Sequence, residues 1–143
     1  MKIRVINGPN LNMLGIREPE IYGRETYEDL VGFILQSAED LGVEAQCLQS
    51  NHEGEIVTWI QQALGQADAI VINPAAYTHT SVAILDALKA VGLPAVEVHL
   101  SDVSAREPFR QVSYPAMACQ KVIMGHGFAG YREAMEFLIS PAK

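Results

Sequence analysis

The sequence predicts an α/β protein: a doubly wound sheet of five parallel strands with helices on both faces. Short apolar runs alternate with segments of helical periodicity from one end of the chain to the other. Such alternation implies parallel strands joined by right-handed crossovers. The 143 residues, 49% of them hydrophobic, are enough for one globular domain, which we expect to span residues 1–143.

Five β-rich runs are the expected strands, at residues 3–7, 43–48, 69–73, 95–99 and 122–124. Pro74 ends the third run because proline cannot donate a ladder hydrogen bond. Thr26 and Asp29 form a capping pair for the first helix, and Gly42 closes it. The helices should bury Leu30, Ile34, Ala38 and Leu41, then Ile56, Ile60, Ala63 and Leu64, then Ile84, Leu85, Leu88 and Val91, and finally Tyr131, Ala134, Met135 and Leu138.

The charge and cysteine content narrow the function classes. A net charge of -7 and a pI near 5.0 disfavour binding to nucleic acid or to an anionic membrane. Cys47 and Cys119 lack paired spacing, and the four histidines lack metal-ligand spacing, so we expect neither a disulfide nor a metal site. No leader and no apolar run of roughly 18 residues is present, so we expect a cytoplasmic protein without a membrane partner.

Polar residues follow three of the expected strands. Open α/β sheets bind ligands beyond the carboxyl ends of their strands, where the strand order reverses. Residues 7–10, 73–79 and 99–101 should therefore converge on one site.

Glu97 and His99 are two residues apart in an expected strand and so project to the same face. A carboxylate there can bond one ring nitrogen and leave the other for proton transfer. A polar pair at a strand end without a catalytic duty is an equally good interpretation of these residues alone.

Arg17 and Tyr22 lie in a glycine- and proline-punctuated loop after the first strand. A free tyrosine has a pKa of about 10, so a phenolate base near neutrality needs roughly 4 kcal/mol of stabilisation. A guanidinium about 4 Å away could supply most of this. Spacing alone favours the alternative, an arginine beside an unrelated aromatic ring.

Two further clusters carry groups suited to a polar ligand. Asn73 and His79 could bind hydroxyls, whereas Thr78, Thr80 and Ser81 suit helix capping. In the segment 106–110, an arginine could hold a substrate carboxylate together with the amides of Leu100 and Ser101. Solvated arginines are the alternative.

Five motifs together resemble the type II 3-dehydroquinate dehydratases: NGPNLNMLGIREPEIYG (7–23), QSNHEGE (49–55), NPAAYTHTS (73–81), EVHLSD (97–102) and REPFRQVSY (106–114). The resemblance covers nearly the whole chain. It implies a flavodoxin-like fold, a homo-dodecamer built as a tetramer of trimers, and no cofactor. It also implies anti dehydration of 3-dehydroquinate to 3-dehydroshikimate through an enolate, in the shikimate pathway of aromatic amino-acid biosynthesis.

The resemblance also implies roles for individual residues. Tyr22 matches the base beside the substrate ketone, Arg17 the residue that keeps it ionised, and Asn10 the asparagine that holds a water against the enolate oxygen. His99, oriented by Glu97, matches the acid that protonates the departing hydroxyl. The matching substrate-binding positions are Asn73, His79, Leu100, Ser101 and Arg110, with Asp86 reaching the site of an adjacent subunit.

Asp86 lies off the apolar stripe of its helix, so without the resemblance a solvated face is the favoured interpretation.

The chain departs from the family pattern at Asp102, where asparagine is usual, at Gln111, where histidine is common, and at Gln120 and Lys121, in a stretch that often carries glycine. Asp102 adds negative charge near the expected carboxylate clamp, which bears on substrate affinity rather than on reaction type.

Three alternatives stay open at this stage. A type I dehydratase would need a lysine imine, but the lysines stand at strand starts, on a helix or at the terminus. A flavodoxin-like binding module or receiver would need a phosphate loop or acidic residues where Asn7 and Gly8 stand. A dehydratase of quinate breakdown would use the same residues as a biosynthetic one.

Overall fold

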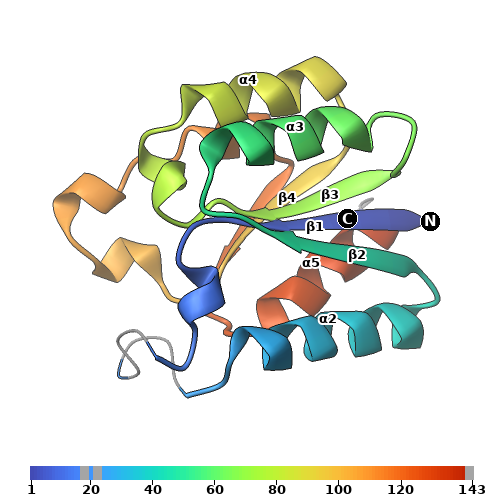
Figure 1. Ribbon diagram of the computed structural model, residues 1–143, viewed down its shortest axis with the longest axis horizontal. Coiled ribbons are helices and arrows are strands. Elements are labelled where there is room, and N and C mark those ends of the chain that lie inside the picture. Colours follow the sequence, from blue (N-terminus) through green and yellow to red (C-terminus); the bar gives the residue numbers. More distant parts are fainter. Residues whose placement is uncertain (17–19, 21–23, 141–143) are drawn as a thin grey trace.

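A parallel five-stranded sheet forms the centre of the protein (Figure 1). The computed structural model describes residues 1–16, 20 and 24–140. The strands are β1 (Lys2–Asn7), β2 (Glu44–Gln49), β3 (Ala69–Asn73), β4 (Ala95–His99) and β5 (Lys121–Met124). Their spatial order, β2-β1-β3-β4-β5, reverses direction between β1 and β3 and is the flavodoxin-like order. The predicted fold class is confirmed.

Among the described residues, two helices cover each face of the sheet (Figure 1). On one face lie α2 (Tyr27–Leu41) and α5 (Ala129–Ile139), and on the other lie α3 (Glu53–Ala63) and α4 (Val82–Val91). Because side chains alternate along a strand, β3 contributes to both cores: Val71 packs on the α2 and α5 side, and Ile70 and Ile72 pack on the α3 and α4 side. The central strands are therefore buried on both faces, as parallel sheets require.

The predicted helix signals of α2 are confirmed. The Asp29 amide donates to the Thr26 hydroxyl, the Thr26 amide donates to the Asp29 carboxylate, and Gly42 ends the helix at φ 73°. Three burial details differ from the sequence prediction. Leu41, expected in the core stripe of α2, is half-buried. Leu64, expected in the core stripe of α3, follows the last helical residue and is 61% exposed. Val91 is half-buried rather than buried.

Short 3-10 helices follow the carboxyl ends of three strands. η1 (Leu11–Met13) follows β1 and η2 (Ala75–His79) follows β3, while η3 (Val103–Ala105), η4 (Pro108–Arg110) and η5 (Pro115–Ala118) lie between β4 and β5. These segments position the site described below. Within the described ranges, no helix combines the length and apolarity needed to cross a membrane.

Candidate active site

A pocket lies at the carboxyl edge of the sheet, where the strand order reverses. Its walls come from the segments after β1, β3 and β4, as the sequence predicts. Six of the predicted site residues line it: Asn10, Asn73, His79, Leu100, Ser101 and Arg110. The convergence of these distant segments is therefore a property of the fold.

The segment carrying Asn10 is held against the end of β3. The Gly8 amide donates to the Asn73 carbonyl at 2.8 Å, and a Cβ at Gly8 would lie 2.5 Å from the Pro74 carbonyl oxygen. Only glycine fits this approach. Asn10 has φ 69°, a left-handed conformation that asparagine tolerates. Its backbone N–H donates to Asn51 Oδ1 at 3.0 Å.

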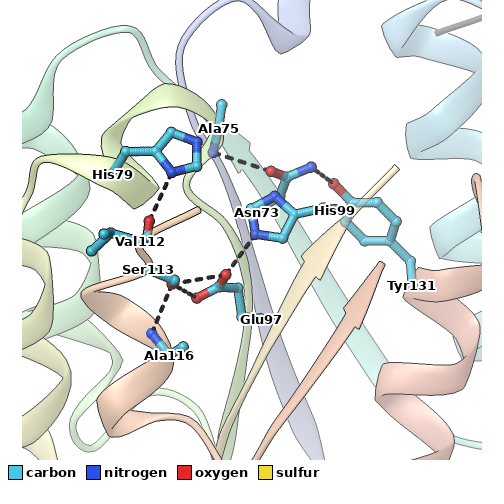
Figure 2. Close-up of polar contacts among 9 residues, drawn as sticks. All are labelled: Asn73, Ala75, His79, Glu97, His99, Val112, Ser113, Ala116 and Tyr131. Atoms are coloured by element: carbon cyan, nitrogen blue, oxygen red, sulfur yellow. Dashed lines mark hydrogen bonds and ion pairs between the residues drawn. The ribbon is translucent and has the colours of Figure 1, made fainter. Parts of the chain in front are cut away.

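The Asn73 side chain is fixed by the protein on both sides (Figure 2). Its Oδ1 accepts from the Ala75 amide at 3.1 Å, and its Nδ2 donates to the Tyr131 hydroxyl at 3.0 Å. Tyr131, fully buried on α5, donates in turn to Asn7 Oδ1 at 2.6 Å. Burial raises the pKa of Tyr131, so it acts as a neutral phenol donor in this network.

Glu97 and His99 face each other as the strand periodicity predicts. His99 Nε2 lies 2.5 Å from Glu97 Oε2, Glu97 has no exposed surface, and His99 is 6% exposed (Figure 2). Because a carboxylate accepts hydrogen bonds, it selects the ring form that carries a proton on Nε2. The other ring nitrogen, Nδ1, takes no part in this contact, and the pocket wall begins at the next residue, Leu100.

The ring of His79 is also anchored through one nitrogen. Its Nδ1 lies 2.8 Å from the Val112 carbonyl oxygen, which can only accept (Figure 2). The proton on Nδ1 therefore belongs to this bond. Nε2 is left as the nitrogen that can contact a hydroxyl in the pocket.

The arginine segment carries its own carboxylate. Arg110 Nε donates to Glu107 Oε1 at 2.7 Å, and Arg106 Nε lies 3.7 Å from the same oxygen. A backbone hydrogen bond at Glu107, then the hydrogen bond from Arg110 and the charges of both arginines, lower the pKa of the Glu107 carboxyl. An incoming carboxylate at Arg110 would share that guanidinium with Glu107.

Two of the four departures from the family pattern, Asp102 and Gln111, have structural roles in this segment. Asp102 caps η3 by accepting from the Ser104 amide at 3.0 Å and from the Ser104 hydroxyl at 2.5 Å. The side-chain amide of Gln111 donates to the carbonyls of Val103, Arg106 and Glu107 at 3.0, 3.2 and 3.3 Å. Gln111 thus ties together the turns that carry both arginines.

The family described as dehydroquinase class II matches residues 1–139 of this sequence. The chain belongs to the class II dehydroquinase family. The 3-dehydroquinate dehydratase of Clostridium acetobutylicum is 55% identical over 131 residues, which are 92% of this chain and 91% of that protein. The corresponding protein of Phenylobacterium zucineum is 57% identical over 94% of this chain and 92% of its own length.

A solved structure supports the same family assignment through its fold. The type II dehydroquinase from Butyrivibrio crossotus is 51% identical and superposes with a TM-score of 0.96, covering 98% of each chain. The flavodoxin-like arrangement is thus that of a type II dehydroquinase.

The remaining five predicted site residues are not among those that line the pocket; of these, Glu97 and His99 lie directly before the lining residue Leu100 in the chain. Arg17 and Tyr22 lie outside the described residues. Asp86 is exposed on α4 and does not line the pocket.

The capping assignment after β3 is right for one residue of three. The Ser81 hydroxyl accepts from the Ile84 amide at 2.9 Å and caps α4. Thr78 is buried, and its hydroxyl has no hydrogen-bond partner among the described residues. Thr80 is the C-cap of η2, directly after its last residue, rather than an N-cap.

Several residues that hold the candidate site residues in place were not predicted from the sequence. Asn51 contacts the Asn10 segment, Tyr131 contacts Asn73, and Ser113 contacts Glu97. Asn51 and Ser113 lie in the family motifs, which was a usable signal. Tyr131 fits the apolar stripe of α5, so nothing in its spacing indicates a polar duty.

Cysteine and metal chemistry gain no support from the part of the chain that the structure describes. Burial raises the pKa of the Cys47 thiol to about 11, and burial together with the charge of Glu97 raises that of Cys119 to about 12. Neither forms a disulfide. No group of three or more His, Cys, Asp or Glu side chains in residues 1–16, 20 and 24–140 could hold a metal ion.

Proposed function

We propose that this type II dehydroquinase converts 3-dehydroquinate to 3-dehydroshikimate and water by acid–base chemistry of its own side chains. The observation that carries the proposal is the buried Glu97–His99 contact beside a pocket with hydroxyl- and carboxylate-binding groups. An elimination needs a proton donor for the leaving hydroxyl. His99 has one nitrogen engaged and the other available for that task.

In the proposed reaction, the Tyr22 phenolate, stabilised by Arg17, removes a proton from the carbon beside the substrate ketone. The C–H electrons form an enolate, which a water held by Asn10 stabilises. His99, protonated on both ring nitrogens with the Glu97 carboxylate balancing its charge, then gives the Nδ1 proton to the hydroxyl on the next carbon and is left as the neutral Nε2–H form. The C–O bond breaks, water leaves, and the enolate electrons form the carbon–carbon double bond by anti elimination.

The pocket supplies binding groups for the rest of the substrate. Asn73 and His79 would contact hydroxyls, and Arg110 with the Leu100 and Ser101 segment would hold the carboxylate. The preset orientations of Asn73 and His79 reduce the reorganisation needed on binding. No cofactor takes part in these steps.

We infer the cellular location, the pathway and the oligomeric state of the enzyme from its family. We propose that the enzyme acts in the cytoplasm, in the shikimate pathway, as a dodecamer made of four trimers. Exposed Asp86 on α4 would then reach the site of an adjacent subunit. Analytical ultracentrifugation tests the assembly, because a monomer at working concentration would contradict it.

The test of the function is turnover by chelator-treated protein. Adding 3-dehydroquinate should produce the ultraviolet absorbance of a conjugated enone. Borohydride added with substrate should leave the protein mass unchanged, because no lysine imine forms. Folded protein that binds the substrate without forming the enone would indicate a binding module instead, and a yellow protein with tightly bound flavin would indicate a flavodoxin.

A further inference from the structure

We propose that Ser113 is a positioning residue for the acid: its hydroxyl fixes the Glu97 carboxylate, which in turn fixes the ring of His99. The inference deepens the proposed dehydration and rests on it. Ser113 does not line the pocket, so it would act through Glu97 and His99 rather than on the substrate.

The contact between Ser113 and Glu97 involves both carboxylate oxygens. Ser113 Oγ lies 2.8 Å from Oε1 and 3.0 Å from Oε2 (Figure 2). His99 Nε2 contacts Oε2. The carboxylate is thus held between the serine hydroxyl and the histidine ring, with no exposed surface of its own.

The Ser113 hydroxyl is itself oriented. It accepts from the Ala116 amide at 3.2 Å, at the start of η5 (Figure 2). A hydroxyl has a single proton to donate, and the amide already points at its oxygen. The proton is therefore directed toward Glu97.

The backbone around Ser113 is tied to the hydroxyl-binding side of the pocket. The preceding carbonyl, of Val112, contacts His79 Nδ1 at 2.8 Å, and the following amide, of Tyr114, donates to the Thr78 carbonyl at 3.0 Å. Ser113 is therefore fixed relative to η2, which carries His79. The backbone of residues 112–114 therefore links the proposed acid, through Ser113 and Glu97, to the segment that carries His79.

The contact from Ser113 matters because the carboxylate of a glutamate rotates easily about the last side-chain bond. The last torsion of the side chain has broad, roughly two-fold preferences, so one hydrogen bond leaves the carboxylate plane poorly defined. A second donor bridging both oxygens defines it. Small misplacements of a catalytic group lower turnover strongly, whereas substrate binding by other residues is retained.

The kinetic test compares Ser113→Ala with Ser113→Thr. Ser113→Ala should lower kcat roughly tenfold to hundredfold, the loss expected when a hydrogen bond to a charged group is removed, with KM within about twofold. Ser113→Thr keeps the hydroxyl and should restore most of kcat. The matched control is Ser37→Ala, which removes a buried serine hydroxyl in α2, where the residue is 3% exposed, and should leave kcat unchanged.

A double-variant experiment separates positioning from a general structural role. If Ser113 acts through His99, adding Ser113→Ala to His99→Ala should cause no further fall in kcat. A further fall equal to that seen in the wild-type background would overturn the proposal. Wild-type kcat in Ser113→Ala would overturn it too, as would an equal loss in Ser37→Ala.

A spectroscopic measurement tests Ser113 independently of turnover. Nitrogen NMR of histidine-labelled protein, with the His99 signals assigned from His99→Ala and recorded under conditions in which the ring is neutral, should show the tautomer with its proton on Nε2 in the wild type. Ser113→Ala should shift the His99 signals toward a tautomer mixture, and unchanged signals would overturn the inference. Should the wild type fail to turn over 3-dehydroquinate, the proposed function fails and this measurement alone decides whether Ser113 orients the ring.

Discussion

Three polar side chains at or beside the pocket are oriented by hydrogen bonds to the protein. His99 is held through Nε2 and His79 through Nδ1, and the Asn73 amide is fixed by Tyr131 and Ala75. Ligand-contacting groups whose orientation is set in advance need little reorganisation when charge develops in a reaction. The hydrogen-bond directions at single residues are therefore the strongest structural support for the proposed chemistry.

Tyr22→Phe should abolish dehydration. The variant removes the phenol that would take the proton, so kcat should fall by a factor of about 1000 or more, in the upper range for loss of a general base. Substrate affinity by calorimetry and the circular dichroism spectrum should stay close to those of the wild type. Tyr114→Phe, which changes a tyrosine outside the pocket lining, is the matched control. Near-normal turnover by Tyr22→Phe would remove this residue from the mechanism.

At the residue scale, sequence could predict contacts within one strand but not across the fold. Glu97 and His99 follow from the period of two along β4. Ser113 meets Glu97 from 16 residues away, and Tyr131 meets Asn7 from 124 residues away. These contacts depend on where loops and helices pack, and no local periodicity encodes that.

At the element scale, the ends of β1 and β3 are packed too closely for a side chain at Gly8. In Gly8→Ala, the new Cβ would lie 2.5 Å from the Pro74 carbonyl oxygen, so one strand end must move. We expect a loss of about 1–3 kcal/mol in the free energy of unfolding, as in overpacked sites, together with reduced turnover because Asn10 shifts. Urea denaturation and the enone assay measure the two effects.

Gly32→Ala is the matched control for this prediction. A Cβ at Gly32 in α2 meets nothing within 4 Å, so alanine should stabilise the helix by up to about 1 kcal/mol. Wild-type stability and turnover in Gly8→Ala would show that the two strand ends are not as tightly packed as described.

The bounds of most elements follow from local signals. Thr26, Asp29 and Gly42 delimit α2 as expected, because capping is decided within a few residues. Leu64 is the instructive error: it fits the periodicity of α3, but the helix ends before it and Gly65 turns the chain at φ 84°. Periodicity finds the face of a helix and is a poor guide to its last residue.

At the scale of the whole molecule, strand and helix alternation predicts a doubly wound sheet but leaves the strand order open. The order β2-β1-β3-β4-β5, which places Asn7 beside Asn73 in register, was accessible only through the family resemblance. Once this order is set, the site at the β1 and β3 switch point follows from the topology.

The buried thiols predict a loss of stability in alkali. The pKa of Cys47 rises from 9.0 to about 11 on folding, and that of Cys119 from 9.0 to about 12. Above pH 9 the unfolded chain loses protons that the folded chain keeps, so the free energy of unfolding should fall as pH rises. Each thiol contributes up to about 1.4 kcal/mol per pH unit, and none of this loss occurs well below pH 9.

Urea denaturation between about pH 7.5 and pH 11 at one fixed protein concentration measures this slope. A variant with both Cys47→Ala and Cys119→Ala should have a lower stability near neutrality but a flatter decline in alkali. Tyr131, whose pKa burial also raises, should maintain part of the decline. Equal slopes in the wild type and the double variant would contradict the account of the thiols.

The most direct test of the central claim, that His99 held by Glu97 is the acid of the elimination, is the steady-state kinetics of His99→Ala with 3-dehydroquinate. Loss of a positioned acid should lower kcat by about 100-fold or more and change KM little, because the hydroxyl and carboxylate contacts persist. A change confined to KM, with kcat at the wild-type value, would show that His99 binds the substrate and does not protonate the leaving group.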